Sequence, residues 1–355
     1  MNLWTLIPAD IQTVSVIGMA KNAGKTMTLN RLIVEAREAG KQLGLTSIGR
    51  DGELEDVVTG TEKPGIEVDR GMLLATTDMC LDRSDARVEI LETTDERTPV
   101  GQVVIVRVKQ RGRVELAGPD TSSGIRRVCQ VMLARGAKQV LVDGALNRKS
   151  SASPAITDAS ILSSGAVLDR DMHRVVKETA HQIHLLELPL WEPRECSLKK
   201  MKPEDRGMDK WLPKAYAAGV MSENGMIRAL NLSTALNSGK EIGRAMMKTD
   251  QGVLIRGSLT GRTLKDLASC TDLYRHMPLI IEDATRIFIS GRDWQIWQKR
   301  GLRICVLRKT KLLFVTINPW SPGGWRFDGQ TFLDEMIREA DPVRVINVMG
   351  GEESK

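Results

Sequence analysis

Short apolar runs alternate with helical patterns through the first half of the chain. Runs rich in Val, Ile and Leu have the length of buried strands, and they lie at residues 13–19, 43–49, 103–109, 113–118, 138–145 and 159–168. Apolar residues at intervals of three and four predict helices at residues 24–39, 122–137 and 169–186. Strands that alternate with helices in this way indicate βαβ units and a mostly parallel sheet.

The pattern breaks at residues 189–213, where four prolines stand among mixed charges. Proline cannot continue a helix or a central strand, so this stretch predicts a linker. Beyond it the pattern is again mixed. It predicts helices at residues 232–247, 263–269, 292–301 and 330–340, strands at 252–259, 285–290 and 343–349, and a hairpin-like pair at 302–308 and 312–318.

We therefore expect an α/β protein of two domains. A nucleotide-binding domain with a mostly parallel sheet would occupy residues 1–188, and a mixed α/β accessory or partner-binding domain would occupy residues 214–355. The linker at residues 189–213 would join them. A chain of 355 residues is long enough for two domains that each bury a core.

Composition narrows the class of protein. Hydrophobic residues make up 41% and charged residues 27%, which is typical of globular proteins, and no apolar run is long enough for a membrane span. The first residues lack the pattern of a secretory signal, so we expect a cytoplasmic protein. The net charge of +6 is spread among interleaved acidic and basic residues, which disfavours a nucleic-acid-binding surface. The five cysteines lack Cys-x-x-Cys spacing, which favours reduced structural thiols.

The segment VIGMAKNAGKTMTLN, at residues 16–30, has the order strand, small-residue loop, Gly-Lys-Thr, helix. In such a loop the backbone N–H groups and the positive end of the helix dipole face a phosphate. Lys25 would reach the outer phosphates, and the Thr26 hydroxyl would bind magnesium. The expected phosphate-binding residues are Gly18, Lys21, Asn22, Ala23, Gly24, Lys25, Thr26 and Met27.

The spacing departs from G-x-x-x-x-G-K-[ST], because Met19 stands at the place of the first glycine and Gly18 precedes it. The alternative interpretation is an ordinary turn before a helix. The clear strand before the loop and the good helix after it favour a phosphate loop. Asp143, at the end of a buried strand, supports this, because a carboxylate there needs a partner and a metal ion supplies one.

The loop GMAKNAGKT resembles that of the dethiobiotin synthetase and cobyrinic acid synthase group of phosphate-loop NTPases, which is related to MinD. The resemblance covers the first half of the chain. It implies that Asp51, after the second strand, and Asp143 hold magnesium or position the attacking water, so Lys25, Asp51 and Asp143 are the expected catalytic residues. Thr26, Asp51 and Asp143 are the expected metal ligands. For Asp51 a turn residue before Gly52 is the competing interpretation.

Other chemistry receives less support from the sequence. The guanine-specific N-K-x-D motif is absent, which favours ATP over GTP as the nucleotide. His181 and His184 share a helix face, but no companion ligand is placed to complete a metal site. The sequence contains no G-x-S-x-G elbow, which disfavours a hydrolase with a Ser-His-Asp triad.

Four of the seven tryptophans lie between Trp294 and Trp325. Trp294 and Trp297 share a predicted helix face, whereas Trp320 and Trp325 lie in the turn-rich segment NPWSPGGWRFDG. A domain core is the favoured interpretation of these tryptophans, and a partner interface is the alternative.

A closer resemblance covers nearly the full length. GMAKNAGKTMTLN, SIGRDGE, VDGALNRKSSASPAITDASILSSGA, NPWSPGG and INVMGG together resemble the phosphate-loop subunits of reactivating factors for lysine 5,6-aminomutase and related mutases. The resemblance implies an ATPase that acts with magnesium and a second, MutS-like ATPase subunit. Its target would be an adenosylcobalamin-dependent aminomutase, whose damaged cofactor it helps to exchange.

Two other functions remain open at this point. The first is a dethiobiotin-synthetase-like ligase that acts on a small carboxylate, for which Arg148 and Lys149 could supply the positive charge. The second is a non-catalytic binding module, in which Lys25 and Thr26 would be incidental. Nucleotide turnover with and without a partner protein distinguishes the three.

Overall fold

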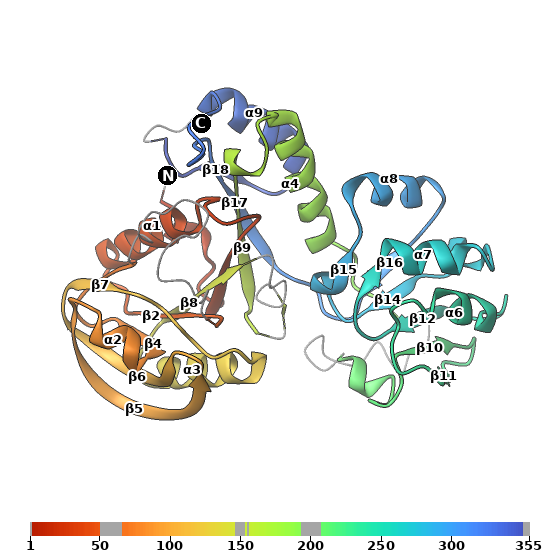
Figure 1. The fold of residues 1–355 in the computed structure, drawn as a ribbon, viewed down its shortest axis with the longest axis horizontal. Coiled ribbons are helices and arrows are strands. Elements are labelled where there is room, and N and C mark those ends of the chain that lie inside the picture. The colour runs from red at the N-terminus through yellow and green to blue at the C-terminus, as the bar shows by residue number, and fades with distance from the viewer. Residues whose placement is uncertain (1, 50–65, 146–152, 155, 193–206, 351–355) are drawn as a thin grey trace. The chain divides into compact units, whose positions relative to one another are not determined.

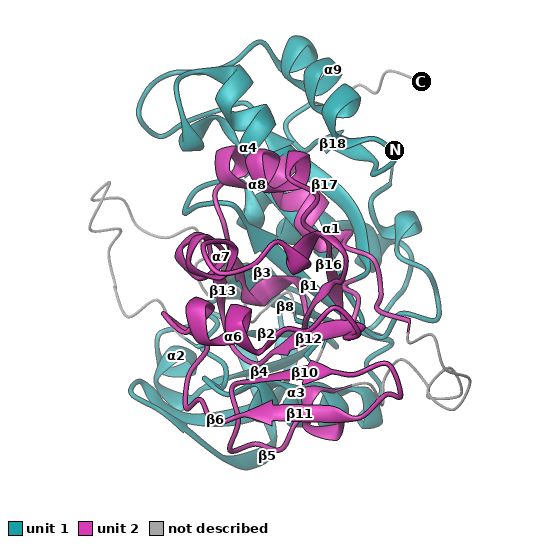
Figure 2. Cartoon of the chain, turned by 90° about the vertical axis from the view of Figure 1, so that its right-hand side faces the viewer, with its two compact units in different colours: residues 1–180, 311–355 teal, residues 181–310 magenta. Residues whose placement is uncertain are grey.

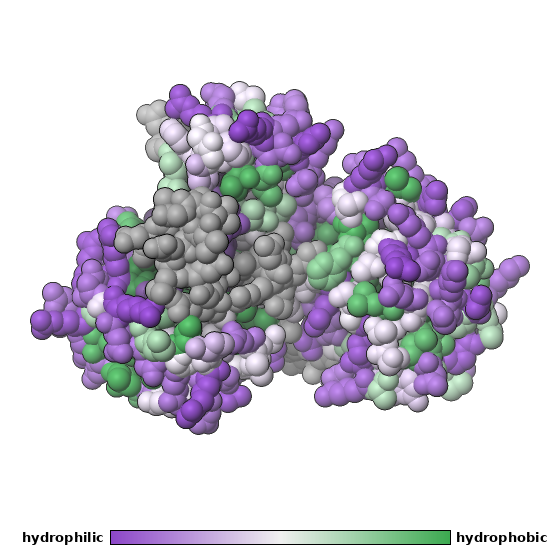
Figure 3. Space-filling view, viewed as in Figure 1, coloured by the Kyte–Doolittle hydropathy of each residue, from purple (hydrophilic) through white to green (hydrophobic). Residues whose placement is uncertain are grey.

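The fold was analysed in a computed structural model that describes residues 2–49, 66–145, 153–154, 156–192 and 207–350. The chain divides into two compact units, residues 1–180 with 311–355 and residues 181–310 (Figure 2). Hydrophilic residues cover most of the face of each unit that Figure 3 shows, and apolar residues form small groups among them.

Unit 1 is built on a nine-stranded sheet in the order β18-β17-β9-β1-β8-β2-β4-β6-β5 (Figure 1). In this order, the strands from β18 to β4 run parallel to one another, and β6 runs antiparallel to both of its neighbours, β4 and β5. The strands of unit 1 are β1 (Thr13–Gly18), β2 (Leu43–Ser47), β3 (Ile66–Val68), β4 (Leu73–Thr77), β5 (Arg87–Thr98), β6 (Gly101–Gln110), β7 (Gly112–Val114), β8 (Gln139–Ala145), β9 (Ala159–Gly165), β17 (Leu312–Asn318) and β18 (Val345–Asn347). Its helices are η1 (Trp4–Leu6), α1 (Lys25–Glu38), α2 (Asp78–Asp82), α3 (Ser122–Ala134), η3 (Ala166–Leu168) and α9 (Gly329–Ala340), and α4 (Met172–Leu186) runs from this unit into unit 2.

Helices α1 and α3 cover opposite faces of this sheet. Leu141 packs in the cluster that holds the apolar face of α1, whereas Val140 and Val142 pack in the cluster that holds α3. Successive side chains of a strand point to opposite faces, so the alternation along β8 separates the two helices. Asp143 therefore shares a face with Leu141 and lies on the α1 side.

Unit 2 contains a five-stranded sheet in the order β11-β10-β12-β14-β16. Strands β12, β14 and β16 run parallel, and β10 and β11 run antiparallel to their neighbours. Its elements are η5 (Met208–Lys210), β10 (Ala218–Met221), β11 (Ile227–Leu230), α6 (Gly239–Ala245), β12 (Gly252–Ile255), β13 (Leu259–Thr260), α7 (Gly261–Ala268), η6 (Leu273–Arg275), β14 (Leu279–Ile281), η7 (Ala284–Arg286), β15 (Ile287–Phe288), α8 (Gly291–Lys299) and β16 (Ile304–Val306).

The fold confirms the α/β class with a large, mostly parallel sheet. The division into units differs from the expected one, in which residues 214–355 form a second domain after a linker at residues 189–213. In the structure, residues 311–355 belong to unit 1. The reason is long-range pairing: β17 lies parallel to β9, with Phe314 opposite Ile161. The expected hairpin of residues 302–308 with 312–318 is wrong, because β16 pairs with β14 in the sheet of unit 2.

Among the described residues, no helix combines the length and the apolar composition that crossing a membrane requires.

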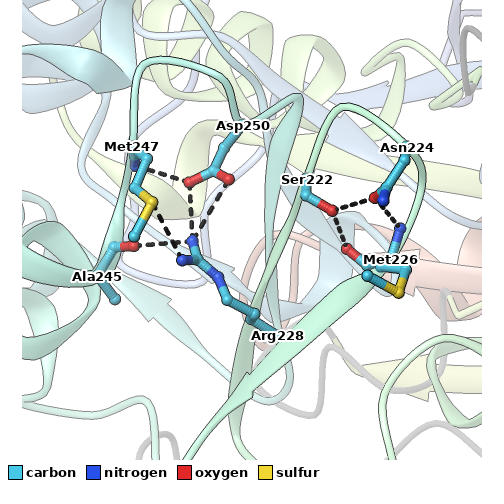
Figure 4. Close-up of polar contacts among 7 residues, drawn as sticks. All are labelled: Ser222, Asn224, Met226, Arg228, Ala245, Met247 and Asp250. Atoms are coloured by element: carbon cyan, nitrogen blue, oxygen red, sulfur yellow. Dashed lines mark hydrogen bonds and ion pairs between the residues drawn. The ribbon is translucent and has the colours of Figure 1, made fainter.

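A buried carboxylate joins three segments of unit 2 (Figure 4). The Asp250 side chain is only 2% exposed, and its oxygens accept hydrogen bonds from Arg228 Nη2 at 3.1 and 3.3 Å and from Met247 N at 2.6 Å. Arg228 Nη2 also donates to Ala245 O at 3.1 Å. The carboxylate therefore fixes β11 to the chain that follows α6.

Asp250→Ala should lower the free energy of unfolding of unit 2 by about 3 kcal/mol, because it leaves the Arg228 guanidinium and the Met247 amide without their acceptor. The matched control is Asp272→Ala in the same unit, since Asp272 is 73% exposed and pairs with Arg275 at the surface. The control should cost at most about 1 kcal/mol. Chemical denaturation of the full chain measures both, and equal effects of the two substitutions would contradict a structural role for Asp250.

Candidate functional site

The loop between β1 and α1 lies at the carboxyl edge of the nine-stranded sheet, because it follows the last residue of β1. Strand β1 runs between β8 and β9, and its last residue, Gly18, pairs with both. The chain leaves this edge through residues 19–24 and enters α1 at Lys25. Ligands of parallel α/β sheets bind at this edge, next to the point where neighbouring strands leave the sheet in opposite directions. The fold thus places the Gly-Lys-Thr segment at a position suited to a ligand.

Two residues with positive φ shape the loop. Asn22 has φ 63° and Gly24 has φ 101°. A methyl group added to Gly24 would lie 3.0 Å from Asn318 Cβ, so the position combines an unusual backbone conformation with a close neighbour. Both conditions favour glycine.

The Lys25 side chain turns back over the end of β1. A methyl group at Gly18 would lie 2.7 Å from Lys25 Cγ and 2.8 Å from Cδ, so the absence of a side chain at Gly18 makes room for the lysine stem. This contact gives a physical reason for the glycine one residue earlier than the common spacing predicts. The loop is also fixed at its start by Met19 N, which donates to Ser163 O of β9 at 2.8 Å.

Lys25 and Asp143 form an ion pair at this edge. Lys25 Nζ lies 3.8 Å from Asp143 Oδ1, and the two side chains are 17% and 33% exposed. Asp143 belongs to β8, where it pairs with Val16 on one side and with Ser47 on the other. The carboxylate is therefore held on a central strand, close to the amine and partly open to solvent.

The first turn of α1 presents backbone donors beside this pair. The first hydrogen bond within the helix runs from Thr28 N to Gly24 O at 3.0 Å. The amides of Lys25, Thr26 and Met27 precede it and have no acceptor inside the helix. Together with the helix dipole they favour an anion at this end.

Buried hydroxyl groups join α1 to β9 and β17 beneath the loop. Thr28 Oγ1 lies 2.8 Å from Thr316 Oγ1 and 3.3 Å from Ser163 Oγ, and Thr316 Oγ1 donates to Ser163 Oγ at 2.9 Å. All three side chains are at most 1% exposed. Because buried hydroxyl groups are costly to leave unpaired, this cluster fixes the start of α1 against two strands.

The end of β17 forms one wall of the site, and the sequence does not reveal it. Asn318 is 8% exposed and lies against Gly24, as noted above, and also against Gly165 at the end of β9. A methyl group at Gly165 would lie 2.6 Å from Asn318 O and 3.3 Å from Ala23 O. The polarity of Asn318 after an apolar strand is the one signal that could have indicated it.

The expected phosphate-binding residues are brought together by one loop and the first turn of α1. Ala23 and Gly24 are buried, Lys21 and Thr26 are half-buried, and Asn22 and Met27 are exposed. Thr26 is the second residue of α1. Asp51, Arg148 and Lys149 lie outside the described residues.

The four tryptophans from Trp294 to Trp325 lie in two kinds of environment. Trp294 and Trp297 are 6% and 3% exposed and belong to the core of unit 2, which confirms the core interpretation for them. Trp320 is 50% exposed, and Trp325 is half-buried and donates from Nε1 to Ala166 O at 3.0 Å.

The described histidine and cysteine side chains have structural surroundings. His181 Nε2 lies 2.9 Å from Ile289 O, and its ring packs against Trp294. Burial raises the pKa of the Cys129 thiol to about 12, so this thiol stays protonated and weakly nucleophilic at neutral pH. Within the described ranges, no three or more His, Cys, Asp or Glu residues are grouped to hold a metal ion by themselves.

The chain was compared with models of protein families, with curated proteins and with solved structures, and none of the three comparisons found a match.

Gly24→Ala should destabilise unit 1 by more than the strain of its backbone conformation alone, because the new methyl group also meets Asn318. The matched control is Gly71→Ala, since Gly71 has φ 94° and nothing within 4 Å of an added methyl group. The control should cost about 1–2 kcal/mol, the ordinary penalty of a non-glycine residue in this region. Chemical denaturation measures both variants. A Gly24 variant as stable as the Gly71 variant would contradict the close approach of β17 to the loop.

Proposed function

We propose that the chain binds and hydrolyses ATP with magnesium, and that it acts as an accessory protein that reactivates an adenosylcobalamin-dependent aminomutase. One observation carries the nucleotide part of this proposal: Lys25, whose amine pairs with the Asp143 carboxylate, begins α1 directly after a glycine-containing loop, and the first amides of this helix have no acceptor inside it. This combination offers positive charge and N–H donors to a phosphate chain. An ordinary turn before a helix does not require a lysine that folds back toward a carboxylate on a central strand.

Each group has a distinct part in binding. The amides of Lys25, Thr26 and Met27 would donate to phosphate oxygens, and the dipole of α1 would favour their charge. Lys25 would move its amine from Asp143 to the outer phosphates, because a phosphate carries more negative charge than one carboxylate. That exchange would free Asp143 for a second task.

The side-chain oxygen atoms of Thr26 and Asp143 are suitable ligands for magnesium. Thr26 offers a hydroxyl and Asp143 a partly exposed carboxylate, and these oxygen ligands are the type that Mg²⁺ takes together with phosphates and waters. A site of this kind needs only one or two protein carboxylates, so it requires no larger cluster of acidic residues. When bound, the ion would neutralise charge that develops on the phosphates. Asp51 stays a candidate third ligand.

The hydrolysis step needs little covalent chemistry from the protein. In this step the oxygen of a water would bond to the γ-phosphorus as the bond to the ADP oxygen breaks; Lys25 would stabilise the negative charge on the phosphates, and Asp143 would help to position the metal ion and the water. The hydroxyl cluster of Thr28, Thr316 and Ser163 would keep the first turn of α1 in place during this step. Loss of the γ-phosphate would then return Lys25 to Asp143, which gives the loop two states.

The mutase part of the proposal rests on the sequence resemblance to reactivating-factor subunits. In this role the chain would act with a MutS-like ATPase subunit and would use the two states of the loop to promote exchange of damaged cobalamin. The absence of an N-K-x-D motif supports ATP rather than GTP as the nucleotide. The residues that the ligase alternative would use, Arg148 and Lys149, lie outside the described ranges.

Lys25→Met should abolish most hydrolysis and leave stability nearly unchanged, because methionine keeps the stem that packs over Gly18 and removes only the charge. The loss should be on the order of a hundredfold or more in rate, equivalent to about 3 kcal/mol of barrier. Phosphate release in the presence of magnesium and ATP measures it. The control is Lys41→Met, an exposed lysine just beyond α1. Turnover equal to that of the control would exclude the loop as the hydrolytic site.

Asp143→Asn should separate binding from turnover, because the amide keeps the size of the carboxylate but not the charge that magnesium needs. We expect ATP binding to persist and hydrolysis to fall at least tenfold. In an assay with damaged mutase, fresh adenosylcobalamin, ATP, magnesium and the second subunit, this variant should fail to restore activity. Asp120→Asn, at an exposed position before α3, is the matched control.

Two outcomes of that assay would contradict the proposal. Normal restoration by Asp143→Asn would show that hydrolysis here does not drive the exchange. Failure of the unchanged chain with every component present would count against the reactivating role, and formation of a small-molecule product from ATP and a carboxylate would favour the ligase.

A further inference from the structure

Two residues of β17 contact the two ends of the first turn of α1. Thr316 Oγ1 lies 2.8 Å from Thr28 Oγ1, and Asn318 Cβ lies 3.0 Å from the position of a methyl group added to Gly24. Residues two apart in a strand point to the same face of a sheet, so one face of β17 makes both contacts. The amides of residues 25–27, which have no acceptor inside the helix, follow Gly24 and precede Thr28.

The hydroxyl groups of Thr28, Thr316 and Ser163 form a closed ring. Thr316 Oγ1 donates to Ser163 Oγ at 2.9 Å, and Ser163 Oγ lies 3.3 Å from Thr28 Oγ1. A hydroxyl group has one proton, so Thr316 does not also donate to Thr28. The contact of 2.8 Å between them therefore uses the proton of Thr28, and Ser163 is left to donate to Thr28.

Packing by itself does not explain the hydroxyl group of Thr316. Its side chain is 1% exposed on a parallel strand, a setting in which valine and isoleucine are the usual residues. Thr28 and Ser163 are fully buried, so water does not replace a lost partner. The backbone fixes the ring, because Ser163 pairs with Thr316 in one ladder of the sheet and with Gly18 in the other.

The hydroxyl group of Thr28 has a second acceptor within reach. Its Oγ1 lies 3.1 Å from Gly24 O, which already accepts from Thr28 N at 3.0 Å. A threonine that donates to the carbonyl four residues earlier tends to bend a helix and to destabilise it slightly. In α1 this bend would fall in the turn that carries the amides of residues 25–27. Donation to Thr316 instead keeps the turn regular.

We propose that Thr316 is a positioning residue for phosphate binding, because its hydroxyl group takes the proton of Thr28 and thereby keeps the amides of the first turn of α1 aligned. In this assignment Thr316 touches no substrate atom and acts through Thr28. The inference rests on the proposed nucleotide function and extends it to a residue 288 positions after Thr28 in the sequence.

The test compares Thr316→Val, which keeps the volume of the side chain and removes the hydroxyl group, with Thr316→Ser, which keeps the hydroxyl group. Titration calorimetry on the full chain measures the binding of inorganic triphosphate with magnesium. Thr316→Val should weaken binding about tenfold, as expected when one hydrogen bond to a charged group is lost. Thr316→Ser should bind within about twofold of the unchanged chain.

The matched control is Thr76→Val on β4, three strands from β1 in the sheet. Thr76 is fully buried, and its hydroxyl group donates to Glu115 O at 3.0 Å and accepts from Ala117 N at 3.0 Å. Chemical denaturation should show that this control loses at least as much stability as Thr316→Val. Its binding of triphosphate should nevertheless stay within about twofold, because the lost bonds lie away from the loop.

Thr28→Val tests whether the effect passes through the Thr28 hydroxyl group. This variant loses the same bond to Thr316 but cannot donate to Gly24 O, so its binding of triphosphate should stay within about twofold. Adding Thr316→Val to Thr28→Val should likewise change binding less than about twofold, because two facing valines leave no donor to bend the turn. Ser163→Ala replaces Thr316→Val if that variant does not fold, since Thr316 can then donate to Thr28 and return its proton to Gly24 O.

The outcomes separate this inference from the proposed function. Unchanged triphosphate binding in Thr316→Val, no rescue by Thr316→Ser, or equal losses in Thr316→Val and Thr28→Val would each overturn the positioning role and leave the phosphate loop standing. An unchanged chain that does not bind triphosphate would overturn both.

Discussion

The close approach of three strand ends at one edge of the nine-stranded sheet is the constraint on which the rest of the structure depends. Strands β1, β9 and β17 end together, and the chain between β1 and α1 fits among them only because Gly18, Gly24 and Gly165 have no side chains. A methyl group at any of these positions would come within 3.0 Å of a neighbouring atom. The glycines thus allow the packing that places Lys25 beside Asp143.

Through this packing, residues near the end of the chain complete the surroundings of the β1–α1 loop near its beginning. The insertion of unit 2 separates β9 from β17 in the sequence, yet the two strands are neighbours in the sheet. Strand β17 supplies Thr316 to the hydroxyl cluster under α1 and Asn318 to the wall of the loop. The segment after Asn318 lines a cavity together with the residues that end β18 and follow it. A loop built in the first half of the chain is completed by the second.

The sequence predicted those parts of the fold whose signal is local. Strands β1 and β9 are buried along their whole length, as central parallel strands are, and β8 carries the apolar run Val-Leu-Val, whereas α1 and α3 show clear helical spacing. Strand β5 was missed because it lies at the edge of the sheet, where most of its residues are exposed and its register shifts. The sequence predicted a strand at residues 312–318 but not the strand with which it pairs. The reason is that the pattern of a segment indicates its length and burial, and it does not indicate which distant segment lies next to it in the sheet.

The same limit applies to the site. The order of strand, loop and helix predicted the position of Lys25, and the alternation along β8 places Asp143 on the face of α1. The approach of Asn318 to Gly24 joins residues almost 300 positions apart, and no local pattern indicates it. The exposure of the Trp320 ring depends on the fold of one turn-rich segment, and sequence spacing predicts only that this segment is a loop.

Hydrogen exchange of the backbone amides, with and without magnesium and a non-hydrolysable ATP analogue, tests the central claim that phosphates bind at the β1–α1 loop. We expect slower exchange in peptides that cover residues 19–28 and 318–328, and unchanged exchange in β10 and β11 of unit 2. Protection confined to unit 2, or no protection in residues 19–28 at a saturating concentration of the analogue, would contradict it.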